Sequence, residues 1–223
     1  MSFTDLEHEI IGCRKCERLV AFREKVALEK RKSFMDWDYW GKAVPGYGNP
    51  NARMMILGLA PAAHGGNRTG RVFTGDKSAD FLFKCLHHVG LANQPNSDHR
   101  NDGLKLDGYI TPAVKCVPPG DKPTAEEKDN CEPFLVEEFN LLNRLKVVLG
   151  LGKIGFDSCL KFVRKTHPFK MKDYKFSHGV RYKLPNGLTL FGAFHPSPRN
   201  VNTGRLSFEM MVHFLEKVKK ELE

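Results

Sequence analysis

Two polar segments of this sequence carry the residue types that chemistry on a bound ligand requires. The first runs from Gly58 to Asp76 and combines five glycines with histidine, asparagine, arginine and aspartate. It follows the apolar run 54–57, which predicts a buried strand, and precedes a helix expected to start at Ser78. Because α/β sheets bind ligands at the carboxyl ends of their strands, this segment predicts a site that a ligand can approach closely.

The second polar segment, His195–Arg205, follows the apolar run Leu188–Phe194. It places a histidine at the end of a strand, then Pro-Ser-Pro, and then small polar residues between two arginines. This combination suits a rigid loop against a phosphate backbone, with the imidazole facing a pocket. A lone histidine after a strand is often only structural, but the prolines and arginines favour the functional interpretation.

Four of the six cysteines stand in contexts that are typical of ligands. They are Cys13, Cys16, Cys116 and Cys131, with a C-x2-C pair, a gap of about 100 residues, and a C-x14-C pair. Four thiolates can hold zinc or a four-iron cluster, and the spacing alone slightly favours zinc. Four unligated cysteines are the alternative. Cys85 and Cys159 lie on apolar helical faces, so we expect both in the core.

A third pattern, Gly150–Gly155, matches G-x-G-x-x-G between a strand and a helix. A dinucleotide site would also need an acid about twenty residues further on, at the tip of the next strand. Asp173 has that distance but lies in lysine-rich, aperiodic sequence, and no P-loop lysine motif occurs. A tight strand-to-helix turn is therefore the preferred interpretation, with a nucleotide-dependent enzyme as a distant alternative.

Four apolar runs predict strands separated by segments with helical spacing. They are residues 53–58, 109–115, 147–151 and 188–194. Helices are expected within the first 30 residues, over 78–89, after a capping box at Thr124, from the strand ending at 151 to about 165, and from Ser207. The alternation indicates one domain, residues 1–223, with a mainly parallel sheet covered by helices on both faces.

The composition limits the classes of function. A formal charge of +9 and a pI near 9.3 favour a polyanionic partner, most often nucleic acid, although a merely basic surface is the alternative. No apolar run approaches the roughly 18 residues of a membrane span. Because a signal-peptide pattern is also absent from the N-terminus, we expect cytoplasmic residence.

Taken together, the two polar segments resemble the motifs of the uracil-DNA glycosylase superfamily, most closely family 5, the iron–sulfur enzymes called type b. The segment 58–71 is similar to the first motif and 195–204 to the second. The loop 39–46, the segment 114–119 and the cysteine spacing also agree, so the resemblance spans residues 10–215. It implies a three-layer αβα sandwich with a mainly parallel four-stranded sheet, a structural 4Fe-4S cluster on the four cysteines in place of zinc, and base excision.

Three positions depart from the related families. Most of the superfamily carries a polar or acidic water-positioning residue near Leu59 or Ala63, and here both are apolar. In the nearest sister family an asparagine that reads the uracil edge stands where this chain has Pro112. The resemblance therefore implies a range of deaminated bases that includes hypoxanthine as well as uracil.

The resemblance also suggests roles for the first segment. A glycosylase must extrude its base from the duplex, and Phe73 is the candidate to stack on it. The backbone around Leu59, Ala60 and Pro61 would line the base edge, Pro61 with its carbonyl only, and His64 and Asn67 are weaker candidates for base or water contacts. Asp76 is the candidate to orient water or stabilise the sugar cation, with a helix-capping role as the alternative.

In the second segment, His195 would act as a neutral donor to the departing base. Contacts to phosphates are expected from Ser197, Arg199, Asn200 and Arg205, with Arg71 as an addition. Because no lysine stands out as an amine nucleophile, we expect a monofunctional hydrolase that leaves an abasic site without strand cleavage. We also expect a monomer that acts on double- and single-stranded DNA. The competing class is a non-catalytic DNA-binding module containing a metal or a cluster, which would show salt-sensitive binding without turnover.

Overall fold

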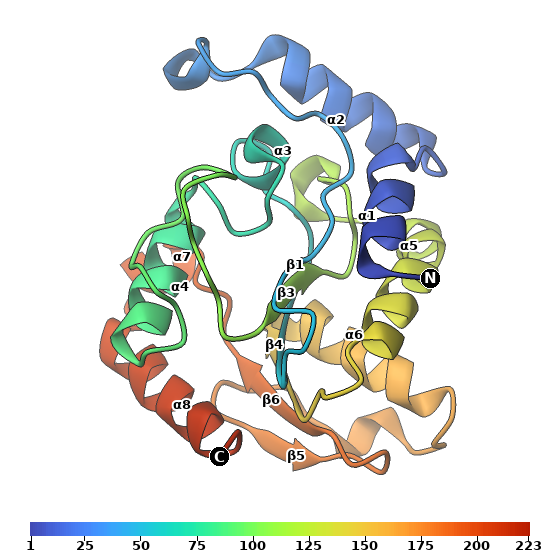
Figure 1. Cartoon of the computed structure of the whole chain (residues 1–223), viewed down its shortest axis with the longest axis vertical. Helices are drawn as coiled ribbons and strands as arrows, with labels where there is room; N and C mark the ends of the chain where they lie inside the picture. Colours follow the sequence, from blue (N-terminus) through green and yellow to red (C-terminus); the bar gives the residue numbers. More distant parts are fainter.

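The chain is built on a six-stranded sheet, and the computed structural model describes all residues, 1–223 (Figure 1). The strands are β1 (Tyr47–Gly48), β2 (Met54–Gly58), β3 (Tyr109–Pro112), β4 (Val147–Leu151), β5 (Arg181–Lys183) and β6 (Thr189–Ala193). Their order is β1-β3-β2-β4-β6-β5. The inner four are parallel and correspond to the four predicted strands, whereas β1 and β5 pair antiparallel at the edges.

Eight α-helices and three short 3-10 turns connect the strands. The α-helices are α1 (Phe3–Gly12), α2 (Glu17–Glu29), α3 (Gly66–Thr69), α4 (Lys77–His88), α5 (Ala125–Leu141), α6 (Gly152–Arg164), α7 (Pro198–Asn202) and α8 (Phe208–Lys220). The 3-10 turns are η1 (Lys32–Phe34), η2 (Pro119–Asp121) and η3 (Met171–Asp173).

Helices cover both faces of the sheet, which confirms the three-layer αβα architecture. Figure 1 shows α4 and α8 on one side and α5 and α6 on the other. Side chains alternate along β2 as a strand period of two requires: Met54 and Ile56 enter the core beneath α4 and α8, whereas Met55 and Leu57 enter the core beneath α5 and α6. Cys85 and Cys159 are fully buried in these two cores, as predicted.

A third, smaller core joins the N-terminal helices to the sandwich. Leu6, Ile10 and Leu19 from α1 and α2 pack there with Phe134 of α5, and all four predicted ligand cysteines belong to this group or contact it. Figure 1 shows α1 beside α5 and α2 extending above the carboxyl ends of the strands. The N-terminal segment is therefore packed on the sandwich around its cysteines.

The Gly150–Gly155 pattern forms the predicted tight turn between β4 and α6, and its glycines allow close packing. A Cβ on Gly150 would lie 2.6 Å from the Phe156 Cα, and one on Gly155 would lie 2.0 Å from the Leu57 carbonyl oxygen. The two glycines thus let α6 lie directly against β2 and β4. Asp173 stands in the separate turn η3 and is exposed, so it forms no nucleotide site with them.

Three predicted element boundaries need correction. The cap of α4 is Asp76, two residues before the expected Ser78. The strand expected over 109–115 ends at Pro112, which lacks a donor for a ladder hydrogen bond. The loop expected over 195–205 contains the short helix α7, with Pro198 as its first residue and Ser197 as its cap. The capping box at Thr124 and Glu127 is present as predicted.

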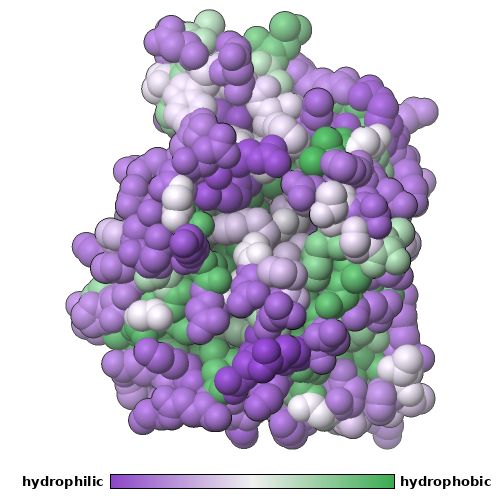
Figure 2. Space-filling model, in the orientation of Figure 1, coloured by the Kyte–Doolittle hydropathy of each residue, from purple (hydrophilic) through white to green (hydrophobic).

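The surface shown in Figure 2 is mostly hydrophilic, with hydrophobic atoms gathered in recesses between the elements. None of the helices combines the length and apolarity that crossing a bilayer would require.

Candidate active site

A cleft of about 660 Å³ opens at the carboxyl edge of the parallel strands. Its walls come from the glycine-rich segment after β2, the start of α4, Asp121 after β3 and Pro198 after β6, together with Phe34 and Trp37 near η1. Segments far apart in the sequence therefore meet where the fold predicts a ligand site. The cleft has the size of ordinary small-ligand pockets, which span roughly 300–1,000 Å³.

Asp76 lines this cleft and also caps α4. Its Oδ1 accepts hydrogen bonds from the backbone N–H groups of Ser78 (2.9 Å) and Ala79 (3.0 Å), so the capping alternative is correct. Its Oδ2 has no protein donor and faces Gly65, where an added Cβ would lie only 2.0 Å away. Burial raises the pKa of Asp76 more than the two capping bonds lower it. Oδ1 thus stabilises the start of α4, whereas Oδ2 is left without a protein donor and can contact a ligand or water.

Phe73 and His195 lie next to each other, although 122 positions separate them in the sequence. Their ring centroids are 5.7 Å apart, with an interplanar angle of 33°. Phe73 is held at φ +48°, a left-handed conformation that a bulky residue rarely adopts, and its ring contacts Gly58 at the end of β2. Backbone strain of this kind concentrates at functional sites. The structure thus joins the predicted stacking residue to the predicted donor.

The backbone of His195 is fixed by a hydrogen bond from within its own loop. The Asn200 Nδ2 donates to the His195 carbonyl oxygen at 2.8 Å, so Asn200 positions the histidine and has this contact in place of a free amide. Burial lowers the pKa of His195, and the nearby Asp121 partly opposes that shift. The imidazole is therefore neutral at pH 7, in the state predicted for a donor.

His64 lies on the cleft wall and is oriented by an aromatic neighbour. Its Nδ1 is 3.0 Å from the Tyr39 hydroxyl, and burial together with Arg31 and Arg68 lowers its pKa. The Nε2 of the ring has no hydrogen-bond partner in the protein. His64 thus keeps the geometry that the predicted contact to a base or water needs.

Two predicted contact residues have structural roles. Asn67 is 1% exposed and donates through Nδ2 to the Arg23 carbonyl oxygen at 3.1 Å. Arg71 is 6% exposed, and its guanidinium binds Thr74, Ser97 and the Asp102 carboxylate at 2.8, 3.0 and 2.7 Å. These contacts give both residues a role in fixing the glycine-rich loop, and the expected contacts to a base and to a phosphate stay predictions.

The remaining predicted residues lie in the two segments, after β2 and after β6, that supply walls of the cleft. Arg199 and Arg205 are exposed on the α7 segment, with the Arg205 guanidinium 4.3 Å above the Phe194 ring. Ser197 caps α7 by accepting from the Asn200 N–H at 3.4 Å. Leu59 and Ala60 are partly exposed after β2, whereas Pro61 is buried beneath Gly66.

Two further residues of the cleft are Asp121, which sequence reasoning missed, and Arg68, which it noted in the glycine-rich segment without assigning a role. Asp121 stands at φ +58° in a turn after two prolines and influences His195. Arg68 is sandwiched between Phe34 and Trp37, 3.9 Å from each ring centroid, and donates to the carbonyl oxygens of His64 (2.7 Å) and Gly75 (2.8 Å). The signal for Arg68 was the aromatic-rich stretch before residue 40, which needed a cation to pack against.

The four cysteines gather where three segments of chain meet. Cys13 and Cys16 join α1 to α2, Cys116 follows β3, and Cys131 lies on α5. Three sulfurs accept N–H donors, from Arg23 to Cys116 (3.0 Å), from the Lys115 backbone to Cys131 (3.5 Å) and from Asn130 to Cys16 (3.5 Å). No three His, Cys or carboxylate side chains are spaced to share a single metal ion.

That spacing separates two kinds of metal site. Thiolates on one tetrahedral zinc, with bonds of about 2.3 Å, must approach one another to about 4 Å. Ligands of a four-iron cluster each bind a different iron atom and stand further apart. The donor set of four thiols, with N–H donors to three of them, fits a thiolate-bound metal group of either kind.

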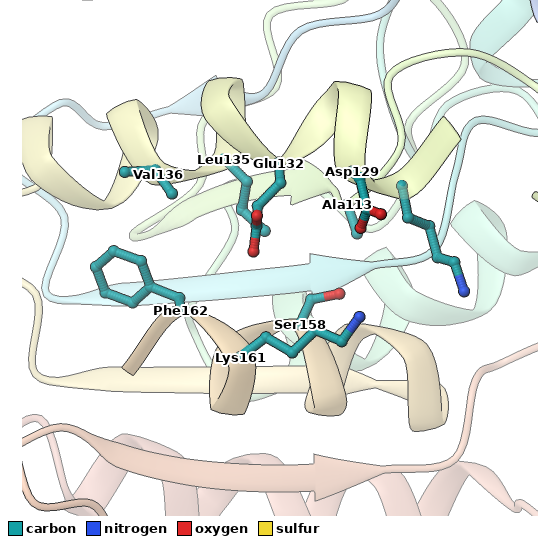
Figure 3. Close-up of a pocket in the computed structure, with 9 residues that line it drawn as sticks. Ala113, Asp129, Glu132, Leu135, Val136, Ser158, Lys161 and Phe162 are labelled. Atoms are coloured by element: carbon teal, nitrogen blue, oxygen red, sulfur yellow. The ribbon is translucent and has the colours of Figure 1, made fainter. Parts of the chain in front are cut away.

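A second cavity lies on the other side of the sheet, between α5 and α6 (Figure 3). It has a volume of about 30 Å³, room for a water molecule rather than a nucleobase. Charged side chains such as Glu132 and Lys161 border it together with the Phe162 ring. The larger cleft is therefore the candidate active site.

Comparisons with known proteins find similar sequences over most of the chain. Residues 45–219 match the family described as the uracil DNA glycosylase superfamily. A type-5 uracil-DNA glycosylase of Pyrobaculum aerophilum is 44% identical over 216 residues, which cover 96% of this chain and 91% of the relative. The type-5 enzyme of Thermus thermophilus is 44% identical over 215 residues, 95% of this chain and 94% of the relative.

Mycobacterial relatives extend the same pattern. A type-5 uracil-DNA glycosylase of Mycobacterium tuberculosis is 43% identical over 221 residues, covering 98% of this chain and 81% of the relative. By contrast, a type-4 uracil-DNA glycosylase of Archaeoglobus fulgidus is 30% identical over 155 residues, 69% of this chain and 61% of the relative. The similarity to type-5 proteins is thus both higher and longer.

Proposed function

This chain belongs to the uracil-DNA glycosylase superfamily, and on that premise we propose that it excises uracil from DNA by hydrolysing the N-glycosidic bond. The observation that carries the proposal is the juxtaposition of Phe73 and His195, whose segments supply Gly75, Asp76 and Pro198 to the walls of the cleft. Stacking, a neutral donor and a carboxylate are the three groups that extrusion and cleavage of a base require.

The base is bound by the Phe73 ring and by the backbone of the residues that follow β2. The flipped base stacks on Phe73, and its edge meets the backbone near Leu59 and Ala60, which are partly exposed. The neutral His195 donates to a carbonyl oxygen of the base. That bond strengthens as the base departs with negative charge, and such donors are worth on the order of 10² to 10³ in rate.

Hydrolysis then needs a water molecule and a negative group near the sugar. The bond from C1′ to the base nitrogen breaks with its electron pair leaving on the base, and water forms the new C1′–O bond. Asp76 Oδ2 orients the water, takes its proton and stabilises the developing sugar cation, while Oδ1 keeps the carboxylate in place through α4. The departing base is protonated by solvent, and an abasic site remains without strand cleavage.

The range of substrates follows from Pro112, which stands where the nearest sister family has an asparagine that reads the uracil edge. Pro112 is buried at the end of β3 and offers no side-chain donor to discriminate the uracil edge. Recognition by stacking and backbone groups tolerates other deaminated bases, so hypoxanthine belongs to the proposed substrate range. Arg199 and Arg205, both exposed, would hold the phosphates of double- or single-stranded DNA.

The proposed cofactor is a 4Fe-4S cluster on Cys13, Cys16, Cys116 and Cys131. The four clustered thiols, two of them buried, and the N–H donors to three of them support a thiolate-bound group here, and the family resemblance favours the cluster over zinc. Bound there, the cluster would crosslink three segments of chain, and it takes no part in the cleavage steps. In this proposal the enzyme acts as a cytoplasmic monomer.

The test incubates the protein with duplexes carrying uracil opposite guanine, uracil opposite adenine, or hypoxanthine, and with uracil in single strands. Alkali then cuts every abasic site. We expect cut product from the uracil substrates and, more slowly, from hypoxanthine. Salt-sensitive binding with no product on any substrate would instead support a non-catalytic DNA-binding module.

A further inference from the structure

Arg23 is a buried cation without a carboxylate partner. Its side chain is among the most deeply buried large side chains, with 2% of the residue exposed, and it forms no salt bridge with Asp or Glu. One guanidinium nitrogen donates to the Cys116 sulfur and the other to the Cys13 carbonyl oxygen, both at 3.0 Å. Its Nε is buried with no acceptor. A buried charge in this state is costly unless an anion stands beside it.

The anion that the surroundings can supply is a thiolate. A Cys116 sulfur that binds iron is deprotonated, and a four-iron cluster with four thiolates carries net negative charge. Arg23 would then make a charge-assisted hydrogen bond, roughly twice as strong as a neutral one. The proposed cluster thus supplies an anion directly beside the buried guanidinium, at the Cys116 sulfur.

The backbone of Arg23 leads in the opposite direction, toward the cleft. The main-chain carbonyl oxygen of Arg23 accepts a hydrogen bond from the side-chain Nδ2 of Asn67 at 3.1 Å. The main-chain carbonyl oxygen of Asn67 in turn accepts from the Gly41 N–H at 3.0 Å. Asn67 lies in α3, directly after His64 and Gly65 on the cleft wall. A single residue of α2 therefore contacts both the cysteine site and the loop that forms the base pocket.

We propose that Arg23 is a positioning residue that neutralises the Cys116 thiolate and ties the cluster to the glycine-rich loop. The inference rests on the proposed cofactor and adds a role that the reaction itself does not need. Two consequences follow. A positive N–H donor on a ligand sulfur stabilises the reduced cluster, so it raises the reduction potential. The same contact also fixes the part of α2 that holds Asn67.

The experiment compares Arg23→Gln with Arg18→Gln, a matched control on the same helix. Arg18 joins α2 to Glu127 with two hydrogen bonds of 2.7 Å but touches no sulfur. In the iron-loaded protein we expect Arg23→Gln to lower the reduced-to-oxidised ratio at fixed potential at least tenfold, a shift of about 59 mV. We also expect amides 65–70 to exchange hydrogen at least tenfold faster. Arg18→Gln should change neither.

Asn67→Ala separates the two ends of the connection. It should accelerate exchange of amides 65–70 while leaving the reduction potential unchanged. If Arg23→Gln does not load iron, Arg23→Lys decides: full loading of the lysine variant supports charge neutralisation, and equal loss in both contradicts it.

Three results would overturn the inference. An unchanged potential in iron-loaded Arg23→Gln, or an equal shift in Arg18→Gln, removes Arg23 alone and leaves the glycosylase proposal intact. A wild-type protein that binds zinc instead of iron removes this inference together with the proposed cofactor. The uracil assay is independent of all three.

Discussion

At the residue scale, Asp76 shows how one carboxylate can serve fold and chemistry together. Oδ1 satisfies two backbone N–H groups at the start of α4, while Oδ2 stays without a partner beside Gly65. Because burial raises its pKa, the folded state holds the ionised form at a cost. A carboxylate with a raised pKa on the wall of a cleft, such as Asp76, is typical of a functional site.

This division predicts the behaviour of Asp76→Asn. Asparagine caps helices about as well as aspartate, so α4 should keep its start. The folded pKa of Asp76 lies above its unfolded value, so its stabilising contribution is present below pH 3.8 and lost as the pH rises through the folded pKa. At pH 7 we therefore expect an equal or higher melting temperature, with single-turnover uracil excision slowed roughly 10² to 10⁴-fold.

The control is Asp173→Asn, which changes an exposed acid in η3 that does not line the cleft. It should leave the excision rate within a few-fold of wild type. An Asp76→Asn enzyme with full activity would restrict Asp76 to its capping role.

His195 gives a prediction about pH. Burial lowers its pKa below the ordinary 6.5, and the Asp121 carboxylate works in the opposite direction. In an NMR titration of the imidazole, the wild-type pKa should thus lie below 6.5, and Asp121→Asn should lower it further. Asp173→Asn should leave it unchanged. A titration at or above 6.5 would contradict the neutral donor on which the cleavage step depends.

At the element scale, two arginines differ in their surroundings: Arg199 lies on the surface of the α7 segment, whereas Arg71 is buried against the loop formed by residues 97–102. Arg199 is exposed and directly follows Pro198, which lines the cleft. Arg71 is buried and forms an ion pair with Asp102, whose pKa is about 2, because four hydrogen bonds to its carboxylate, the one from Arg71 foremost, outweigh its burial. Only an exposed guanidinium can displace counterions from DNA.

We therefore expect Arg199→Ala to weaken DNA binding and to reduce the slope of log K against log salt by about one. Arg71→Met should leave that slope unchanged but destabilise the fold by about 3–5 kcal/mol, because Asp102 loses its buried partner. Binding isotherms at several salt concentrations and urea unfolding measure the two effects. A smaller salt slope in folded Arg71→Met would return Arg71 to the DNA interface.

These elements also show what the sequence could predict. The inner strands, the capping box at Thr124 and the Ser207 cap follow from local patterns, because period, caps and turns act over a few residues. A local pattern also brought His195 forward as a candidate, whereas Phe73 was added by the family resemblance. Whether Arg71 faces solvent depends on Ser97 and Asp102, which are 26 and 31 positions away. Tertiary contacts of that kind leave no periodic signal, and the edge strand β1 was missed for the same reason.

At the scale of the whole molecule, the cysteine site connects parts that share little other packing. The sandwich has two large cores of its own, whereas α1 and α2 rest on a core of eight buried residues that includes Cys116 and Cys131. A ligand that binds only the folded arrangement stabilises it in proportion to its affinity. The N-terminal helices should accordingly depend on the cluster more than the sheet does.

That dependence is tested by Cys131→Ser with Cys159→Ala as the control, because Cys159 is equally buried but lies in the apolar core beneath α6. We expect Cys131→Ser to lose iron, sulfide and visible absorbance, and to expose α1 and α2 to proteolysis while amides of β2 and β4 stay protected. Cys159→Ala should lose some global stability and keep its iron. Full iron content in Cys131→Ser, or simultaneous exposure of helices and sheet, would show that the cysteine site does not hold the N-terminal helices on the sandwich.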